Sequence, residues 1–147
     1  MLNETGNQDA NSQLVERWGQ AFDEQLAQLA EKQIQIRRHL HSHPELSGEE
    51  VETTRFIAAN LKAAGLEPVV CHSDRDVETG TFADVTIGNP SPDSPLIGLR
   101  CDIDALPLLD AKSVAYRSMN PGVTHACGHD GHTAIVLGTG LAAAGLQ

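Results

Sequence analysis

The sequence is poor in basic residues, with 10 Lys and Arg against 20 Asp and Glu and a formal net charge of −10. Nucleic-acid phosphates and anionic lipid surfaces are bound by clusters of Lys and Arg, which create a positive potential at the protein surface. The acidic balance of this chain therefore argues against a nucleic-acid partner and against a polybasic membrane anchor.

The sequence also lacks long apolar runs. No stretch approaches the roughly 20 apolar residues that a membrane-spanning helix needs. The first nine residues, MLNETGNQD, have neither the basic head nor the apolar core of a secretory signal. We therefore predict no membrane partner and a cytoplasmic location.

Cysteines are few and widely spaced, at positions 71, 101 and 127. An odd number at such spacings does not suggest a disulfide framework, so Cys71 and Cys101 are predicted to be small buried hydrophobes on strands. The length of 147 residues and the apolar content of 40% fit one globular domain with a modest core.

The densest group of chemically active residues runs from His125 to His132 and reads HACGHDGH. Residues two apart in an extended segment point to the same side, so Cys127 and His129 can converge on one ion, with His125 on that side as well. Gly128 between them allows a tight turn. Thiolate and imidazole donors favour zinc or another borderline transition metal over magnesium and calcium.

Two simpler explanations of this turn are chance crowding around glycines and a structural zinc site. Chance does not explain why so many titratable groups share one turn. A structural zinc site normally has four protein ligands in two pairs, and the sequence shows no second Cys/His pair of that kind. A metal site of the catalytic type therefore fits the pattern better.

The helices are predicted from the spacing of apolar residues. Residues 1–11 are polar and are predicted to be disordered. From Leu14 a helical stripe predicts one long helix or two joined ones, ended by Pro44. A second helix is predicted to begin at the acidic residues after Ser47 and to end at Gly65, and a third begins near residue 131. The first stripe contains Val15, Trp18, Phe22, Leu26, Leu29, Ile36 and Leu40.

Three strands are predicted at 68–71, 81–87 and 96–100, and the last is apolar enough for the middle of a sheet. Asp102 and Asp104 follow it, so both carboxylates are predicted to face one side, where α/β sheets place their sites. A polar strand end before a proline turn explains them equally simply. The predicted fold class is α/β, with a mixed sheet flanked by helices.

The end of the first helix carries alternating histidines, His39, His41 and His43. Such residues spread around a helix, so they cannot all reach one metal ion. Supporting or capping roles and a solvated helix end both remain open. The adjacent Glu49 and Glu50 are predicted to start the next helix rather than to form a catalytic pair.

Three segments together resemble the N-terminal part of the N-acyl-amino-acid amidohydrolases. This branch of the dinuclear zinc-peptidase superfamily includes hippurate hydrolases, indole-acetyl-amino-acid hydrolases and N-acetyl-diaminopimelate deacetylases. The segments are RRHLHSHPEL, LRCDIDALP and above all YRSMNPGVTHACGHDGHTA. The likeness runs from about Ile36 to the end of the chain, and it is specific for the family rather than for one substrate.

The resemblance implies a site for two divalent transition metal ions, zinc, manganese or cobalt. It implies that Cys127 and His129 are metal ligands and that Asp104 is a supporting carboxylate just outside the ligands. His132 is a weaker candidate for a supporting role. The sequence departs from the family at two places beside the site, with threonine at position 124 instead of methionine and aspartate at position 110 instead of glutamate.

The resemblance also implies that residues 12–147 are the N-terminal portion of a catalytic domain. The remainder, the Glu-Glu pair with the general base and the smaller domain that makes complete relatives homodimers would lie beyond Gln147. The implied function is metal-dependent hydrolysis of the amide bond of small N-acyl amino acids, by an enzyme whose incomplete chain is inactive alone. The alternative is a non-catalytic metal-binding or interaction module derived from such an enzyme.

Overall fold

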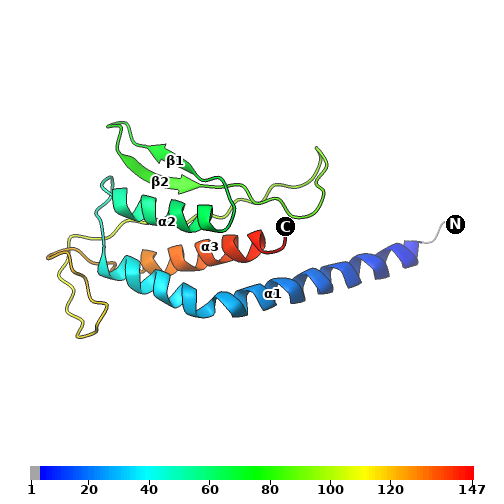
Figure 1. Cartoon of the computed structure of the whole chain (residues 1–147), viewed down its shortest axis with the longest axis horizontal. Helices are drawn as coiled ribbons and strands as arrows, with labels where there is room; N and C mark the ends of the chain where they lie inside the picture. Colours follow the sequence, from blue (N-terminus) through cyan, green and yellow to red (C-terminus); the bar gives the residue numbers. More distant parts are fainter. Residues whose placement is uncertain (1–3) are drawn as a thin grey trace.

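The longest element is α1 (Glu4–Ser42), in a computed structural model that describes residues 4–147 (Figure 1). The apolar stripe predicts this helix, and the structure forms one continuous helix rather than two joined ones. α1 ends two residues before Pro44, because a proline disfavours helical backbone in the residue that precedes it. Within residues 4–147, no helix combines the length and the apolar content that crossing a membrane requires.

α1 also covers residues 4–11, where the polar composition predicts disorder. Residues 1–3, the start of that predicted segment, lie outside the described residues. A helix that has already nucleated gains one hydrogen bond for each residue added, so it extends into a polar segment at little cost. Residues 4–11 contain no proline and a single glycine, Gly6, and so hold no strong helix breaker.

A carboxylate from outside the helix caps the start of α2 (Val51–Ala63). The two oxygens of Glu45 accept the backbone N–H groups of Glu52 and Thr53 at 3.1 and 2.7 Å. These bonds satisfy two of the donors that a helix start leaves open, and the negative charge complements the helix dipole. At the other end, Gly65 adopts a left-handed φ of +81° just after the helix, as the sequence predicts.

β1 (Val69–His72) and β2 (Glu78–Phe82) form an antiparallel pair that packs on α2 (Figure 1). β2 begins at residue 78 rather than at the predicted residue 81. The reason is a tight turn, in which the N–H of Ser73 donates to the carbonyl of Val77 at 2.8 Å and closes the hairpin early. The register pairs Val69 with Phe82, Val70 with Thr81 and His72 with Glu78, with an irregularity between Val70 and His72.

Residues 96–100 do not form the predicted central strand in the described part of the chain. A strand needs a paired neighbour, and no segment among residues 4–147 pairs with this one. Its apolar side chains are therefore exposed, Leu96 by 92%. The chain pairs just beyond it, through a parallel bridge of Leu46 with Ala105 and an antiparallel bridge of residues 106 and 124.

α3 (His129–Ala144) lies alongside α1 and contacts α2 (Figure 1). It begins beside the end of α1, and so brings the HACGHDGH turn to that end of the molecule. The helices meet in one apolar core, and the α/β class with helices packed on paired strands is confirmed. The buried core residues are Ile36, Leu40, Ile57, Leu61, Leu66, Ala134, Leu137 and Leu141.

Candidate metal centre

The HACGHDGH turn leads directly into α3. Gly128 is the last residue before the helix and has a φ of +88°, a left-handed backbone that favours glycine because a Cβ strains it. Cys127 lies exposed immediately before Gly128, and His129 is the first residue of α3. The helix thus starts two residues earlier than predicted, and the two predicted ligands flank its left-handed cap.

His129 is held by Asp104. Its Nδ1 lies 2.9 Å from the carboxylate Oδ1 of Asp104 and 3.0 Å from the backbone carbonyl oxygen of the same residue. Both oxygens only accept hydrogen bonds, so Nδ1 carries the proton and donates. In a neutral ring this leaves the lone pair of Nε2 free, which is the arrangement that a carboxylate imposes on a metal-binding histidine.

The donor set suits a transition metal. A thiol at Cys127 and a free Nε2 at His129 are the atoms that bind zinc and similar ions, at about 2.3 and 2.0–2.1 Å. Among residues 4–147, however, no group of three or more His, Cys, Asp or Glu side chains is arranged around a common point. The described residues therefore fit part of a metal centre, whereas a zinc site needs at least three protein ligands.

The other two histidines of the turn have different surroundings. His125 is buried, and both of its ring nitrogens lack a hydrogen-bond partner among the described residues. Burial lowers the pKa of His125 and keeps its ring neutral. His132 is exposed, with its ring centroid 5.9 Å from that of His129. The expectation that His125 faces a shared ion with the two ligands thus has no support, and the supporting role of His132 stays a prediction.

Asp102 and Asp104 have separate partners. The carboxylate of Asp104 points to His129, while that of Asp102 is half-exposed and pairs with Arg100 at 2.5 Å. The predicted strand that would align the two carboxylates is not formed, so their spacing of two residues does not bring them to one side. Asp104, with its side chain 23% exposed, is the aspartate that belongs to the candidate centre.

The two remaining cysteines lie outside the centre. Cys71 is exposed on β1, contrary to the prediction of a buried residue, because no described element covers that face of the hairpin. Cys101 is half-buried, with its sulfur 3.8 Å from the hydroxyl oxygen of Thr133. Burial raises the pKa of the Cys101 thiol, which favours its protonated form.

A buried polar network lies directly behind the candidate ligands. His41 and Asp130 are each 1% exposed, and His41 Nδ1 lies 2.8 Å from Asp130 Oδ2. The same carboxylate oxygen is 3.4 Å from Nε of Arg37. On its other side, His41 Nε2 lies 2.8 Å from Nζ of Lys112. The sequence motif contains Asp130, but its periodicity gives no sign of a partner 89 residues away.

Asp110 extends this network into the loop that follows. Its carboxylate accepts the backbone N–H groups of Ser118 at 2.8 Å and of Lys112 at 3.1 Å. These two bonds lower the pKa of Asp110. One of its oxygens is also 3.4 Å from His41 Nε2. Asp110 thus closes the loop between residues 110 and 118.

The three alternating histidines separate as predicted. His41 turns inward, whereas His39 and His43 are exposed and stack on each other with ring centroids 4.4 Å apart. Glu50, one of the adjacent glutamates, is buried and accepts the N–H of Gly48 at 2.8 Å. His39, His43 and Glu50 therefore have local partners, and the expectation that Glu49 and Glu50 are not a catalytic pair stays a prediction.

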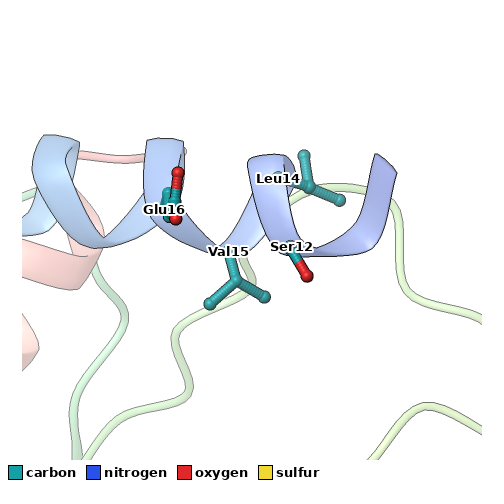
Figure 2. A pocket seen from close by; sticks show the side chains of 4 residues that line it. All are labelled: Ser12, Leu14, Val15 and Glu16. Atoms are coloured by element: carbon teal, nitrogen blue, oxygen red, sulfur yellow. The ribbon is translucent and has the colours of Figure 1, made fainter. Parts of the chain in front are cut away.

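A surface pocket lies far along the chain from these residues, on the N-terminal part of α1 (Figure 2). All four of its lining side chains are exposed, and one of them, Glu16, carries a charge. It contains neither thiol nor imidazole, so it does not resemble the candidate centre. The lining residues are Ser12, Leu14, Val15 and Glu16.

This chain is similar to known proteins in sequence and in structure. Residues 98–147 match the model of peptidase family M20/M25/M40. The last third of this chain is therefore similar to part of a family M20 peptidase domain. Its structure is similar to that of the YXEP protein of Bacillus subtilis, described as a dinuclear metal-binding peptidase from the M20 family, with a TM-score of 0.63 and 40% identity over 72% of this chain and 28% of that one.

Two curated relatives of this chain are amide hydrolases by name. The chain is 46% identical over 115 residues to an N-acetyl-L-cysteine deacetylase of Bacillus subtilis, covering 77% of this chain and 26% of the relative. It is 42% identical over 106 residues to an N-acyl-L-amino acid amidohydrolase of Geobacillus stearothermophilus, covering 72% and 27%. The chain thus spans about a quarter of the length of the curated relatives that it matches.

Proposed function

We propose that a protein containing this chain hydrolyses the amide bond of small N-acyl amino acids at a centre of two divalent transition metal ions, zinc, manganese or cobalt. The observation that carries the proposal is the orientation of His129, whose Nδ1 is engaged by Asp104 so that Nε2 is free, two residues along the chain from the exposed thiol of Cys127. Relatives named as a deacetylase and an amidohydrolase support the same class of reaction.

Each residue has a distinct role in this proposal. Cys127 and His129 are ligands, and Asp104 is a supporting carboxylate that fixes the ring of His129. Bound divalent ions lower the pKa of a water molecule toward 7 and polarise the acyl carbonyl. Residues 12–147 then form the N-terminal portion of the catalytic domain, and a cytoplasmic location and homodimers of the complete protein stay predictions.

Hydrolysis also needs a general base, a carboxylate that accepts the proton of the attacking water and passes it to the leaving amine. Glu50 is engaged with a backbone N–H, and Glu49 lies exposed beside the start of α2. Neither is placed with Cys127 and His129 in a group that could hold an ion. We therefore expect the 147-residue chain to bind metal weakly and to hydrolyse little or no substrate alone.

Metal binding is tested by titrating the purified chain with Co²⁺ and following the absorption band that a thiolate–cobalt bond produces. We expect Cys127→Ser to abolish the band and His129→Ala to weaken binding. Cys71→Ser is the matched control, because Cys71 is also an exposed thiol but lies on β1. A band that survives Cys127→Ser, or that disappears in Cys71→Ser, contradicts the proposed ligands.

The reaction is tested with a panel of N-acetyl and N-benzoyl amino acids, measuring release of the free amino acid. A longer protein that joins this chain to a downstream Glu-Glu segment should be active with metal and inactive after chelation. Robust hydrolysis by the 147-residue chain would contradict the assignment of roles.

A non-catalytic metal-binding or interaction module is the second candidate, because we propose only two ligands, Cys127 and His129, and no general base among the described residues. Binding of Co²⁺ through Cys127 without hydrolysis, even in the longer protein, would favour it.

A further inference from the structure

We propose that His41 is a positioning residue of the metal centre, which fixes the first turn of α3 and so holds the ligand His129 in place. The inference rests on the proposed function, because it assigns His41 a role toward that centre. It starts from the place of His41 at the end of α1, where it is 1% exposed and contacts two segments far from it in the chain.

The two short contacts of His41, at 2.8 Å each, favour one arrangement of its ring, while a carboxylate oxygen of Asp110 lies farther from Nε2, at 3.4 Å. The ammonium group of Lys112 can only donate, so the Nε2 of His41, 2.8 Å away, accepts and carries no proton. The carboxylate of Asp130 accepts, so Nδ1 carries the proton and donates across 2.8 Å. In this arrangement the ring joins a donor on one side to an acceptor on the other, and exchanging its two nitrogens would break both bonds.

Asp130 connects this ring to the ligand. It directly follows His129 in the first turn of α3 and is 1% exposed. A buried carboxylate is costly unless it keeps its hydrogen bonds, so α3 can rotate about its axis only by losing the contact with His41. Metal–ligand distances tolerate changes of only about 0.2 Å, and a small rotation of the first turn would move His129 beyond that limit.

The second contact of His41, with Lys112, is held in place by the loop that begins at Asp110. Asp110 accepts the backbone N–H groups of Ser118 and Lys112 and so closes the loop that carries Lys112. The Nζ of Lys112 then reaches His41. α1, α3 and this loop thus converge on one imidazole. The neighbouring His39 is exposed, stacks on Phe56 and has no part in the network.

Two substitutions of His41 separate its contact with Asp130 from its contact with Lys112. In His41→Asn the amide nitrogen takes the place of Nδ1, so the donor to Asp130 is kept. In His41→Gln the amide reaches the place of Nε2, so the contact with Lys112 is kept and the donor to Asp130 is lost. We expect His41→Gln to weaken Co²⁺ binding about 10-fold, which is the lower end of the effect of removing a residue that supports a metal ligand. The Co²⁺ affinity of His41→Asn should stay within about 3-fold of that of the unaltered chain. His39→Gln is the control on the same helix end and should bind as the unaltered chain does.

A second readout separates positioning from stability. Nitrogen-15 NMR of the metal-free chain reports which ring nitrogen of His129 carries the proton. We expect Nδ1 to carry it in the unaltered chain and in His41→Asn, and a mixture of the two forms in His41→Gln. Circular dichroism verifies that each variant is folded. Should His41→Gln unfold, Asp130→Asn keeps the shape of the carboxylate without its charge and should weaken Co²⁺ binding in the same direction.

The outcomes distinguish the two proposals. If Co²⁺ does not bind through Cys127 in the unaltered chain, the proposed function fails, and the state of the His129 ring in His41→Gln still decides the positioning role. Unchanged Co²⁺ affinity and a single ring form in folded His41→Gln would overturn the inference, as would unchanged affinity in Asp130→Asn. An equal loss in His39→Gln would also overturn it.

Discussion

Removal of the Asp104 carboxylate is the most direct test of how this chain prepares a metal ligand. The ring N–H of His129 has two acceptors on the same residue, the carboxylate at 2.9 Å and the backbone carbonyl at 3.0 Å. Asp104→Ala removes only the first, so Nδ1 should keep its proton through the second. The variant therefore loses the charge-assisted part of the contact while it keeps the orientation of the ring.

The size of the effect follows from these two acceptors. A hydrogen bond to a charged group contributes about 1.5–3 kcal/mol, and the remaining carbonyl places the loss at the lower end, about 1.5 kcal/mol or about 10-fold in metal affinity. Asp104→Asn still offers an amide oxygen, and a neutral bond is roughly half as strong, so we expect a loss of about 3-fold.

The assay is a Co²⁺ titration of both Asp104 variants against a competing chelator, with the unaltered chain measured in parallel. Thermal unfolding serves as the control, because neither substitution removes a buried apolar contact. The order of affinities should be the unaltered chain, then Asp104→Asn, then Asp104→Ala. An Asp104→Ala variant that binds as tightly as the unaltered chain would refute the supporting role. A loss in Asp104→Asn as large as in Cys127→Ser would show that the side chain is itself a ligand.

Further predictions concern the thiols, the core and the effect of pH. Burial raises the pKa of Cys101, so iodoacetamide followed by mass spectrometry should label it more slowly than exposed Cys71. Leu137→Ala opens the core between α1 and α3 and should lower the free energy of unfolding in urea by about 2–5 kcal/mol, whereas exposed Ile135→Ala should change it by less than about 0.5 kcal/mol. Two backbone N–H donors lower the pKa of Asp110. Its stabilisation is therefore present above the unfolded pKa of about 3.9 and is lost as pH falls through the lower folded value, so the stability difference from Asp110→Asn should shrink on acidification below about pH 4.

Local patterns explain why part of this structure is predictable from sequence. The apolar stripe that ends at Leu40 and the proline at position 44 fix the span of α1 near its C-terminal end, because spacing and backbone restriction act within a few residues. The tight turn at Gly128 follows from the same kind of information. Cys127 and His129 lie on either side of this turn, and their role as ligands stays a prediction.

Contacts between distant segments explain most of what the sequence does not reveal. Nothing in the order of residues selects His41 rather than His39 as the partner of Asp130, because the choice depends on which side of α1 packs against α3. The strand predicted at residues 96–100 fails for a related reason. Its composition suits a sheet, but a strand also needs a neighbour, and composition does not supply one.

That unpaired segment bears on the metal centre, because it leads directly into Asp104. Without a strand at 96–100, Asp104 is held from one side by His129 and from the other by its neighbour Ala105, whose N–H donates to the carbonyl of Glu45 at 2.7 Å. A carboxylate at the end of a paired strand would have less freedom than one at the end of an exposed segment, and a ligand support is more effective when its own position is fixed. Any backbone that pairs with residues 96–100 should therefore tighten metal binding at His129 without contacting the ion. On this reasoning, pairing of residues 96–100 and metal binding at His129 would be coupled through Asp104.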